Sequence, residues 1–167
     1  MSKVNVRPMN VEQRNICQMN VKPNIRRMNV EDTLQVYNIE KTIFSLPWSQ
    51  KSFLEACQKL ENIYLTAIID GQVVGYCGMW TVMEEGNITN MAVAEQYRKN
   101  GIAFLLMKEM EQIAIKKGIT AFFLEVRESN INAIKLYEKM KYKSVGIRKN
   151  FYERPVENAI VMSKIIG

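Results

Sequence analysis

The chain has 167 residues, 47% of them hydrophobic and 24% charged, which is typical of one globular domain with a real core. Its net charge of +6 is compatible with a polyphosphate ligand, an acidic protein or nucleic acid, but the basic residues are dispersed, so nucleic-acid binding is not the expected primary function. The sequence has neither a span long and apolar enough for a membrane nor the apolar core of a signal peptide, so we expect a cytoplasmic protein without membrane contact.

Short echoes of one tripeptide mark the start of the chain. Met-Asn-Val occurs at 9–11, 19–21 and 28–30, but units this short cannot build a repeat architecture. We therefore expect residues 1–22 to be an extension of unknown role, and residues 23–167 to form a single domain.

Capping residues and apolar periodicity predict the elements of the first half of that domain. In chain order they are a strand at 24–28, helices at 29–42 and 49–60, and strands at 64–69 and 73–82. Asn29 and Ser49 are suited to cap the two helices, and Asp70-Gly71 is a strong signal for a tight hairpin turn.

The second half alternates strands and helices. The pattern predicts a strand at 87–93, a helix at 101–117, a strand at 121–127, a helix at 130–140, and strands at 144–150 and 158–164. Gly118 is placed to end the first of these helices, and Ser129-Asn130 to cap the second. The sum predicts an α+β fold with a mixed sheet and helices on both faces.

The turn between strand 87–93 and helix 101–117 has the composition of an anion site. Arg98 and Lys99 supply charge, while Gly101 and Ala103 let an anion approach the free N–H groups of a helix N-terminus. The turn lacks the Gly-Lys-Ser/Thr of a Walker loop and two of the three glycines of a dinucleotide fingerprint. An ordinary capped turn is the alternative interpretation.

A carboxylate and a phenol follow on neighbouring elements. Glu125 lies in the strand at 121–127, and Tyr137 shares a helix face with Asn130 and Ala133. Both are thus aimed toward one region. Because the chain has no histidine, proton transfer near neutral pH must use such groups, an amine, a thiol or water.

Each candidate has a structural alternative. Glu125 could pair with Arg127 or Lys143, and Tyr137 could be an aromatic side chain at the edge of the core. The three cysteines, Cys17, Cys57 and Cys77, are far apart, and without histidine they give no metal site.

The loop from Arg98 to Ala103 resembles the pyrophosphate-binding loop of the GNAT N-acetyltransferases, written Arg/Gln-x-x-Gly-x-Gly/Ala. Further segments recur in the order of the RimI-type ribosomal-protein-alanine branch of that family, across about residues 25–165. They are 44–49, 90–93, 124–130, 136–138 and 147–152. The chain departs from the pattern at Met91, Ala103 and Lys141-Tyr142.

The resemblance implies a largely antiparallel central sheet and acetyl-CoA as co-substrate, with no metal. It implies that the pantetheine arm is bound by Met91, Ala92 and Val93. The diphosphate would be bound by Arg98, Lys99, Asn100, Gly101, Ile102, Ala103 and Phe104. Asn130 would contact the cofactor near the thioester. Glu125 would be the base that takes the proton from the amine, and Tyr137 the acid that protonates the departing thiolate. Leu46, Trp48 and Tyr152 would help to wall the acceptor groove.

The resemblance implies that the acceptor is the N-terminal alanine of a small-subunit ribosomal protein. It implies contact with nucleic acid only indirectly, through the ribosome. An α-amine suits this chemistry because its pKa is near 7.7–8.0, against about 10.4 for lysine, so more of it is free base at pH 7. The alternatives are an acetyltransferase for a small amine or other protein N-termini, and a non-catalytic acetyl-CoA-binding module that contacts RNA or the ribosome.

Overall fold

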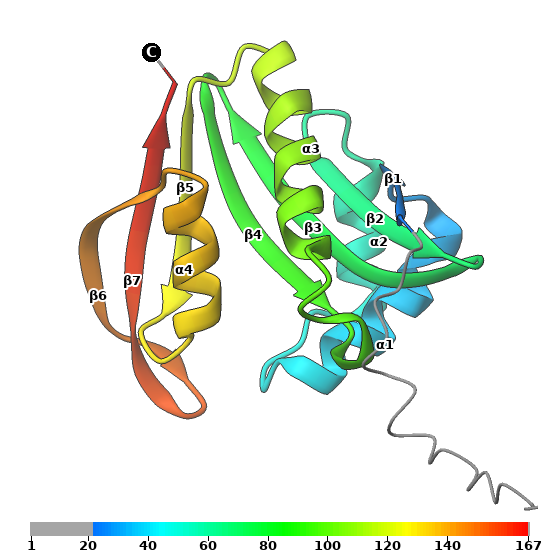
Figure 1. Cartoon of the computed structure of the whole chain (residues 1–167), viewed down its shortest axis with the longest axis horizontal. Coiled ribbons are helices and arrows are strands. Elements are labelled where there is room, and N and C mark those ends of the chain that lie inside the picture. The colour runs from blue at the N-terminus through cyan, green and yellow to red at the C-terminus, as the bar shows by residue number, and fades with distance from the viewer. Residues whose placement is uncertain (1–21, 167) are drawn as a thin grey trace, which may run out of the picture.

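A computed structural model describes residues 22–166. The predicted extension 1–22 lies outside this range except for Lys22, so its separation from the domain stays a prediction. Within the described residues, one sheet has the strand order β1-β2-β3-β4-β5-β7-β6 (Figure 1). The strands are β1 Asn24–Arg27, β2 Ile63–Ile69, β3 Gln72–Val82, β4 Glu85–Val93, β5 Ala121–Arg127, β6 Lys143–Glu153 and β7 Val156–Ile165. Only β4 and β5 pair in parallel, which confirms the mixed, largely antiparallel sheet.

Helices cover both faces of the sheet, as predicted. Figure 1 shows α3 and α4 on one face and α1 and α2 on the other. The helices are α1 Thr33–Ile43, α2 Gln50–Gln58, α3 Ile102–Lys116 and α4 Ile131–Lys139, with short 3-10 turns at Val30–Asp32 and Glu95–Tyr97. No helix among residues 22–166 has the length and apolar character needed to cross a membrane.

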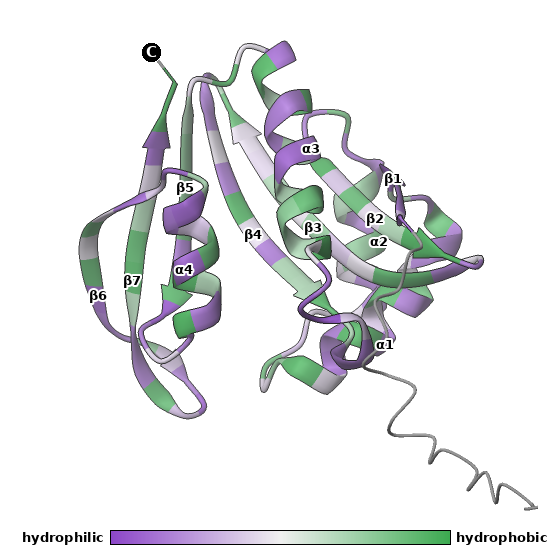
Figure 2. Cartoon of the chain, in the orientation of Figure 1, coloured by the Kyte–Doolittle hydropathy of each residue, from purple (hydrophilic) through white to green (hydrophobic). Residues whose placement is uncertain are grey.

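Each face of the sheet has its own hydrophobic core. Beneath α3 and α4, fully buried side chains such as Leu106, Met110 and Phe122 pack together. Beneath α1 and α2, the buried set includes Phe53 and Tyr76. Burying a side chain of this size contributes ~1.5–3 kcal/mol relative to leaving it exposed. Figure 2 shows the matching alternation of hydrophobic and hydrophilic residues along α3 and α4.

The local signals of the sequence formed the expected turns and caps. Asp70 and Gly71 both have positive φ, at 49° and 76°, which suits the tight hairpin between β2 and β3. The Ser49 hydroxyl accepts a hydrogen bond from the Ser52 N–H at 3.0 Å. The Asn130 side chain accepts one from the Ala133 N–H at 3.2 Å, so both predicted caps are confirmed.

Several element ends differ from the predicted ones. The helix expected from Asn29 begins with a 3-10 turn at Val30–Asp32, where the Asp32 carboxylate accepts the Asn29 N–H at 2.8 Å as half of a capping box. Strand β6 continues to Glu153, and strand β7 begins at Val156, since Arg154 and Pro155 alone make the turn between them. No short apolar run marks these strand ends, so the apolar pattern of the sequence predicted strands that were too short.

β4 and β5 are paired over only part of their length. Their register covers Glu85–Ile88 against Ala121–Leu124, after which the strands diverge toward their C-terminal ends (Figure 1). The β3–β4 register shifts so that Thr89 is an extra residue on β4. A bulge of this kind bends its strand. The sheet is therefore forked between the ends of β4 and β5, and this fork positions the site.

Candidate active site

The free edge of β4 faces the fork. Met91, Ala92 and Val93 pair with β3 through Cys77, Tyr76 and Gly75, but they have no register partner on β5. Backbone polar groups on this edge still need hydrogen-bond partners. The predicted pantetheine-binding residues thus lie where an extended arm could pair with β4 as an added strand.

The predicted anion loop closes one end of this edge. In α3 the first backbone hydrogen bond runs from the Leu105 N–H to the Gly101 carbonyl at 3.1 Å, so the N–H groups of 101–104 precede the helical ladder. Gly101 has a positive φ of 75°, and a Cβ placed on it would meet nothing within 4 Å. A side chain at this position would therefore extend into free space beside the start of α3.

Arg98 and Asn100 hold this loop in shape. The Arg98 Nε donates to the Val93 carbonyl at 3.0 Å, which ties the loop to the end of β4. The Asn100 side-chain amide donates to the carbonyls of Tyr97 and Arg98, at 3.2 and 3.1 Å. The free helix N–H groups and the neighbouring Lys99 charge suit a diphosphate, so the residues present fit the group that the sequence predicted.

Glu125 lies on the α1 and α2 face of the sheet, just past the point where β4 and β5 part. Its neighbours Leu124 and Val126 are buried in the opposite core, and side chains alternate along a strand. The Arg148 guanidinium donates to the Glu125 carboxylate at 2.9 Å. The expected alternative partner, Arg127, instead bonds Glu157 at 3.0 Å.

Tyr137 lies on the other face. Its side chain is 7% exposed within the core beneath α3 and α4, and its ring is 5.9 Å from that of Tyr142. Burial raises the pKa of Tyr137 above its usual range, and the Tyr152 phenol raises it further. The phenol therefore keeps its proton at neutral pH. Glu125 and Tyr137 thus lie on opposite faces of the sheet beside the fork, and their joint action in one region stays a prediction.

Tyr152 is the electrostatic neighbour common to both groups. Burial raises its pKa to about 12, the Arg127 guanidinium lowers it, and the Glu125 carboxylate raises it again. The Arg127 guanidinium lies over the Tyr152 ring, 4.1 Å from its centre. This predicted groove residue is thus half-buried between the candidate base and the candidate acid.

The α1–α2 loop and the β6–β7 turn meet across the open side of the fork. The Ser45 hydroxyl donates to the Arg154 carbonyl, although the two are 109 residues apart. Leu46 is 54% exposed in this loop. The two segments that the sequence predicted as groove walls are therefore in contact.

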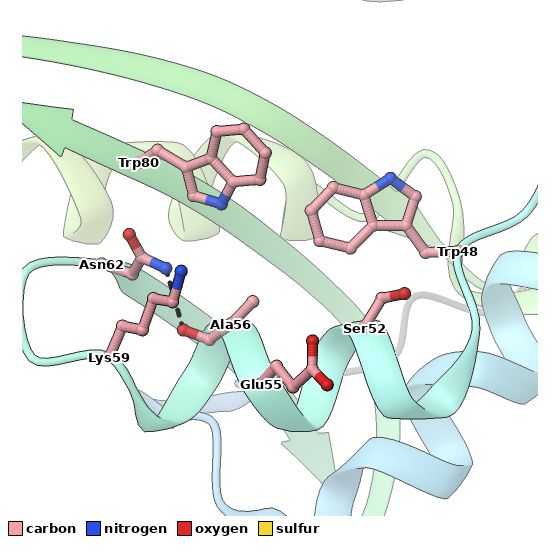
Figure 3. A pocket seen from close by; sticks show the side chains of 7 residues that line it. All are labelled: Trp48, Ser52, Glu55, Ala56, Lys59, Asn62 and Trp80. Carbon is pink, nitrogen blue, oxygen red and sulfur yellow. Dashed lines mark hydrogen bonds between the residues drawn. The ribbon is translucent and has the colours of Figure 1, made fainter.

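Beside this loop the surface is hollowed over about 290 Å³. Figure 3 shows Trp48 and Trp80 side by side above α2, and their ring centres are 5.8 Å apart. The lining consists of Trp48, Ser52, Glu55, Ala56, Lys59, Asn62 and Trp80. Asn87 on β4 is paired with Trp80 and with Phe123 of β5, so one row of residues leads from this hollow to the strand of Glu125. The sequence analysis did not assign Trp80 to a site.

Sequence reasoning also missed a buried carboxylate, that of Glu40. It is 1% exposed, and it accepts hydrogen bonds from the Trp48 backbone N–H at 3.0 Å and from the Tyr76 hydroxyl. A signal was available in the sequence, because Val36, Glu40 and Ile43 share the buried stripe of one helix. A carboxylate on such a stripe is rare unless it is bound by donors.

Comparisons with known proteins agree on one family. The model of the acetyltransferase (GNAT) family matches residues 33–142. A Bacillus subtilis (strain 168) protein, named provisionally as a [ribosomal protein bS18]-alanine N-acetyltransferase, is 37% identical over 86% of this chain and 96% of its own length. The Haemophilus influenzae [ribosomal protein bS18]-alanine N-acetyltransferase is 35% identical over 74% of this chain and 86% of its own.

A solved structure of a protein with the same kind of name has a similar fold. The crystal structure of the ribosomal-protein-S18-alanine N-acetyltransferase from Escherichia coli superimposes with a TM-score of 0.80 at 28% identity. That comparison covers 87% of this chain and 94% of the other.

Proposed function

The chain belongs to the acetyltransferase (GNAT) family, whose members are acetyl-CoA-dependent N-acetyltransferases, and from this premise we propose that it acetylates the α-amine of an N-terminal alanine. The proposed acceptor is a small-subunit ribosomal protein of the bS18 kind, because the names of its relatives state that substrate. The observation that carries the proposal is the fork between β4 and β5, with Glu125 on one face and Tyr137 on the other.

The residues proposed to hold acetyl-CoA follow from the free donors at the fork. The unpaired edge at Met91–Val93 bonds the pantetheine arm, and the N–H groups at 101–104 bond the diphosphate, with Lys99 adding charge. Asn130 caps α4 with its side-chain oxygen, so its amide nitrogen is the group left to contact the arm. Bound acetyl-CoA supplies an acyl group activated as a thioester.

The proposed division of labour uses the two faces of the sheet. An amine that enters from the α1 and α2 side meets Glu125, which takes its proton as it attacks the thioester carbonyl. Tyr137 waits on the cofactor side as a neutral phenol and gives its proton to the departing thiolate. The bond from carbon to nitrogen forms and the bond from carbon to sulfur breaks, so no enzyme-bound acyl group is needed and the cysteines have no role.

Peptides test the function directly. Purified protein should transfer acetyl to a peptide that begins with alanine, and mass spectrometry should place the group on the α-amine. A matched peptide with a blocked N-terminus and an internal lysine should stay unmodified, because its amine is charged at pH 7. Acetylation of lysine or of small polyamines in preference to all N-terminal peptides would contradict the proposal.

Gly101→Glu should weaken acetyl-CoA binding at least ten-fold, measured by calorimetry. The added side chain fills the open space in front of the free N–H groups and repels the diphosphate. Gly118→Glu is the matched control, since Gly118 also has a positive φ and open space but lies at the opposite end of α3. Equal affinities in the two variants would remove the loop from the site.

A further inference from the structure

Glu40 joins three parts of the structure beside the fork. It projects from α1, and its two oxygens accept the Trp48 backbone N–H of the α1–α2 loop and the Tyr76 hydroxyl of β3. The Asn90 side chain of β4 is a neighbour of the same carboxylate and lowers its pKa. Asn90 directly follows the bulged residue Thr89, so this contact reaches the place where β4 bends away from β5.

This carboxylate is costly for the fold. Burial raises the pKa of Glu40 to about 7, although the bonds from Trp48 and Asn90 lower it. A group whose pKa is raised in the folded state stabilises the fold at low pH, and that contribution is lost as the pH rises through about 7. An apolar side chain of similar volume would avoid this cost. Yet such a side chain would leave the buried Tyr76 hydroxyl and the Trp48 N–H without this acceptor, so the carboxylate is placed to hold the loop against β3.

We propose that Glu40 is a positioning residue of the acceptor groove: it fixes the α1–α2 loop at Trp48 against β3. This inference rests on the proposed function, in which that loop forms one wall of the groove. The loop has few other anchors of this kind. Its exposed end is tied to Arg154 through Ser45, and its inner end is held by the bond from Trp48 to Glu40.

The groups that face Glu40 show which protonation state holds the loop. They are Trp48 from the loop, Tyr76 from β3, Asn90 from β4 and the Tyr64 phenol from β2, whose pKa is raised by its own burial and to a smaller extent by Glu40. Among these described neighbours there are donors but no cation. The deprotonated carboxylate accepts from all of its donors, whereas protonation turns one oxygen into a donor and frees one partner. The loop is thus held best above pH 7.

Two substitutions separate positioning from folding. Glu40→Met keeps the volume but removes both acceptors, so the KM for an alanine peptide should rise at least ten-fold. The KM for acetyl-CoA should change less than three-fold, so the contrast between the two KM values separates positioning from any loss of stability, which the thermal midpoint at pH 8 measures. Glu40→Gln keeps one oxygen for the Trp48 N–H and should restore most of the acceptor affinity. Glu111→Gln is the control, since it changes another buried glutamate on the opposite face, paired with Lys164.

A second measurement needs neither substrate. The sequence has two tryptophans, so Trp80→Phe leaves Trp48 as the only one. Its fluorescence should shift with a midpoint near pH 7, and Glu40→Gln should remove the shift. Emission that does not change between pH 5 and 9, or an unchanged acceptor KM in Glu40→Met, would overturn the inference. A protein with no acetyl transfer but with the fluorescence shift would instead refute the proposed function and leave the link between Glu40 and the loop standing.

Discussion

Glu125→Gln should lower turnover at pH 7 by ~10²–10⁴-fold, the usual contribution of a general base. The amide keeps the shape of the side chain and can still meet Arg148, but it cannot take a proton from the amine. Stability should change little, because an exposed ion pair of this kind contributes ~0–1 kcal/mol. Acetyl-CoA affinity should be unchanged, since Glu125 lies on the opposite face from the proposed cofactor-binding helix.

The pH profile provides the sharper test of Glu125. An α-amine has a pKa near 7.7–8.0, so more of it arrives deprotonated as the pH rises. The loss of turnover in Glu125→Gln, relative to the wild type, should therefore become smaller between pH 7 and 9. Glu128→Gln is the matched control, because Glu128 is a nearby exposed carboxylate bonded to Asn158. Near wild-type turnover of Glu125→Gln at pH 7 would rule out the base assignment and point to a water chain.

Tyr137→Phe should also lose ~10²–10⁴-fold in turnover, for lack of a proton donor to the thiolate. The ring and its packing are kept, so the fold and the acetyl-CoA affinity should be retained. From free-solution values, the transfer from tyrosine to a thiol of pKa near 8.5 is uphill by about 2 kcal/mol. Burial raises the pKa of Tyr137, which makes that step costlier and favours a donor that completes the transfer only as the thiolate leaves.

An acyl donor with a more acidic leaving thiol separates the two variants. Its thiolate leaves without help, so it should rescue Tyr137→Phe but not Glu125→Gln. Tyr142→Phe is the control for ring packing, because its ring lies 5.9 Å from that of Tyr137 and its buried hydroxyl has no hydrogen-bond partner among residues 22–166. If Tyr142→Phe lost as much turnover as Tyr137→Phe, packing would explain the effect rather than proton donation.

The sequence by itself determined the local structure, including the shape of the loop at 98–103. Asp70-Gly71, Ser49 and Asn130 act through backbone conformation and hydrogen bonds within a few residues, so they produced the hairpin and the two helix caps that were predicted. The loop at 98–103 was predictable for the same reason, since a glycine with positive φ and the N-terminus of the next helix are close in the chain. The order of elements then implied the mixed sheet.

Only the tertiary structure decided how distant segments meet. Strand periodicity shows that Glu125 alternates with buried residues, but not which face it occupies, because that depends on where α3 and α4 pack. The pairing of Glu125 with Arg148 and the contact of Ser45 with Arg154 depend on the register of β6 and β7, which the sequence left open. Glu40 acquired its environment in the same way, from donors on the α1–α2 loop and on β3. These contacts arise from packing between layers, and no local rule of conformation contains them.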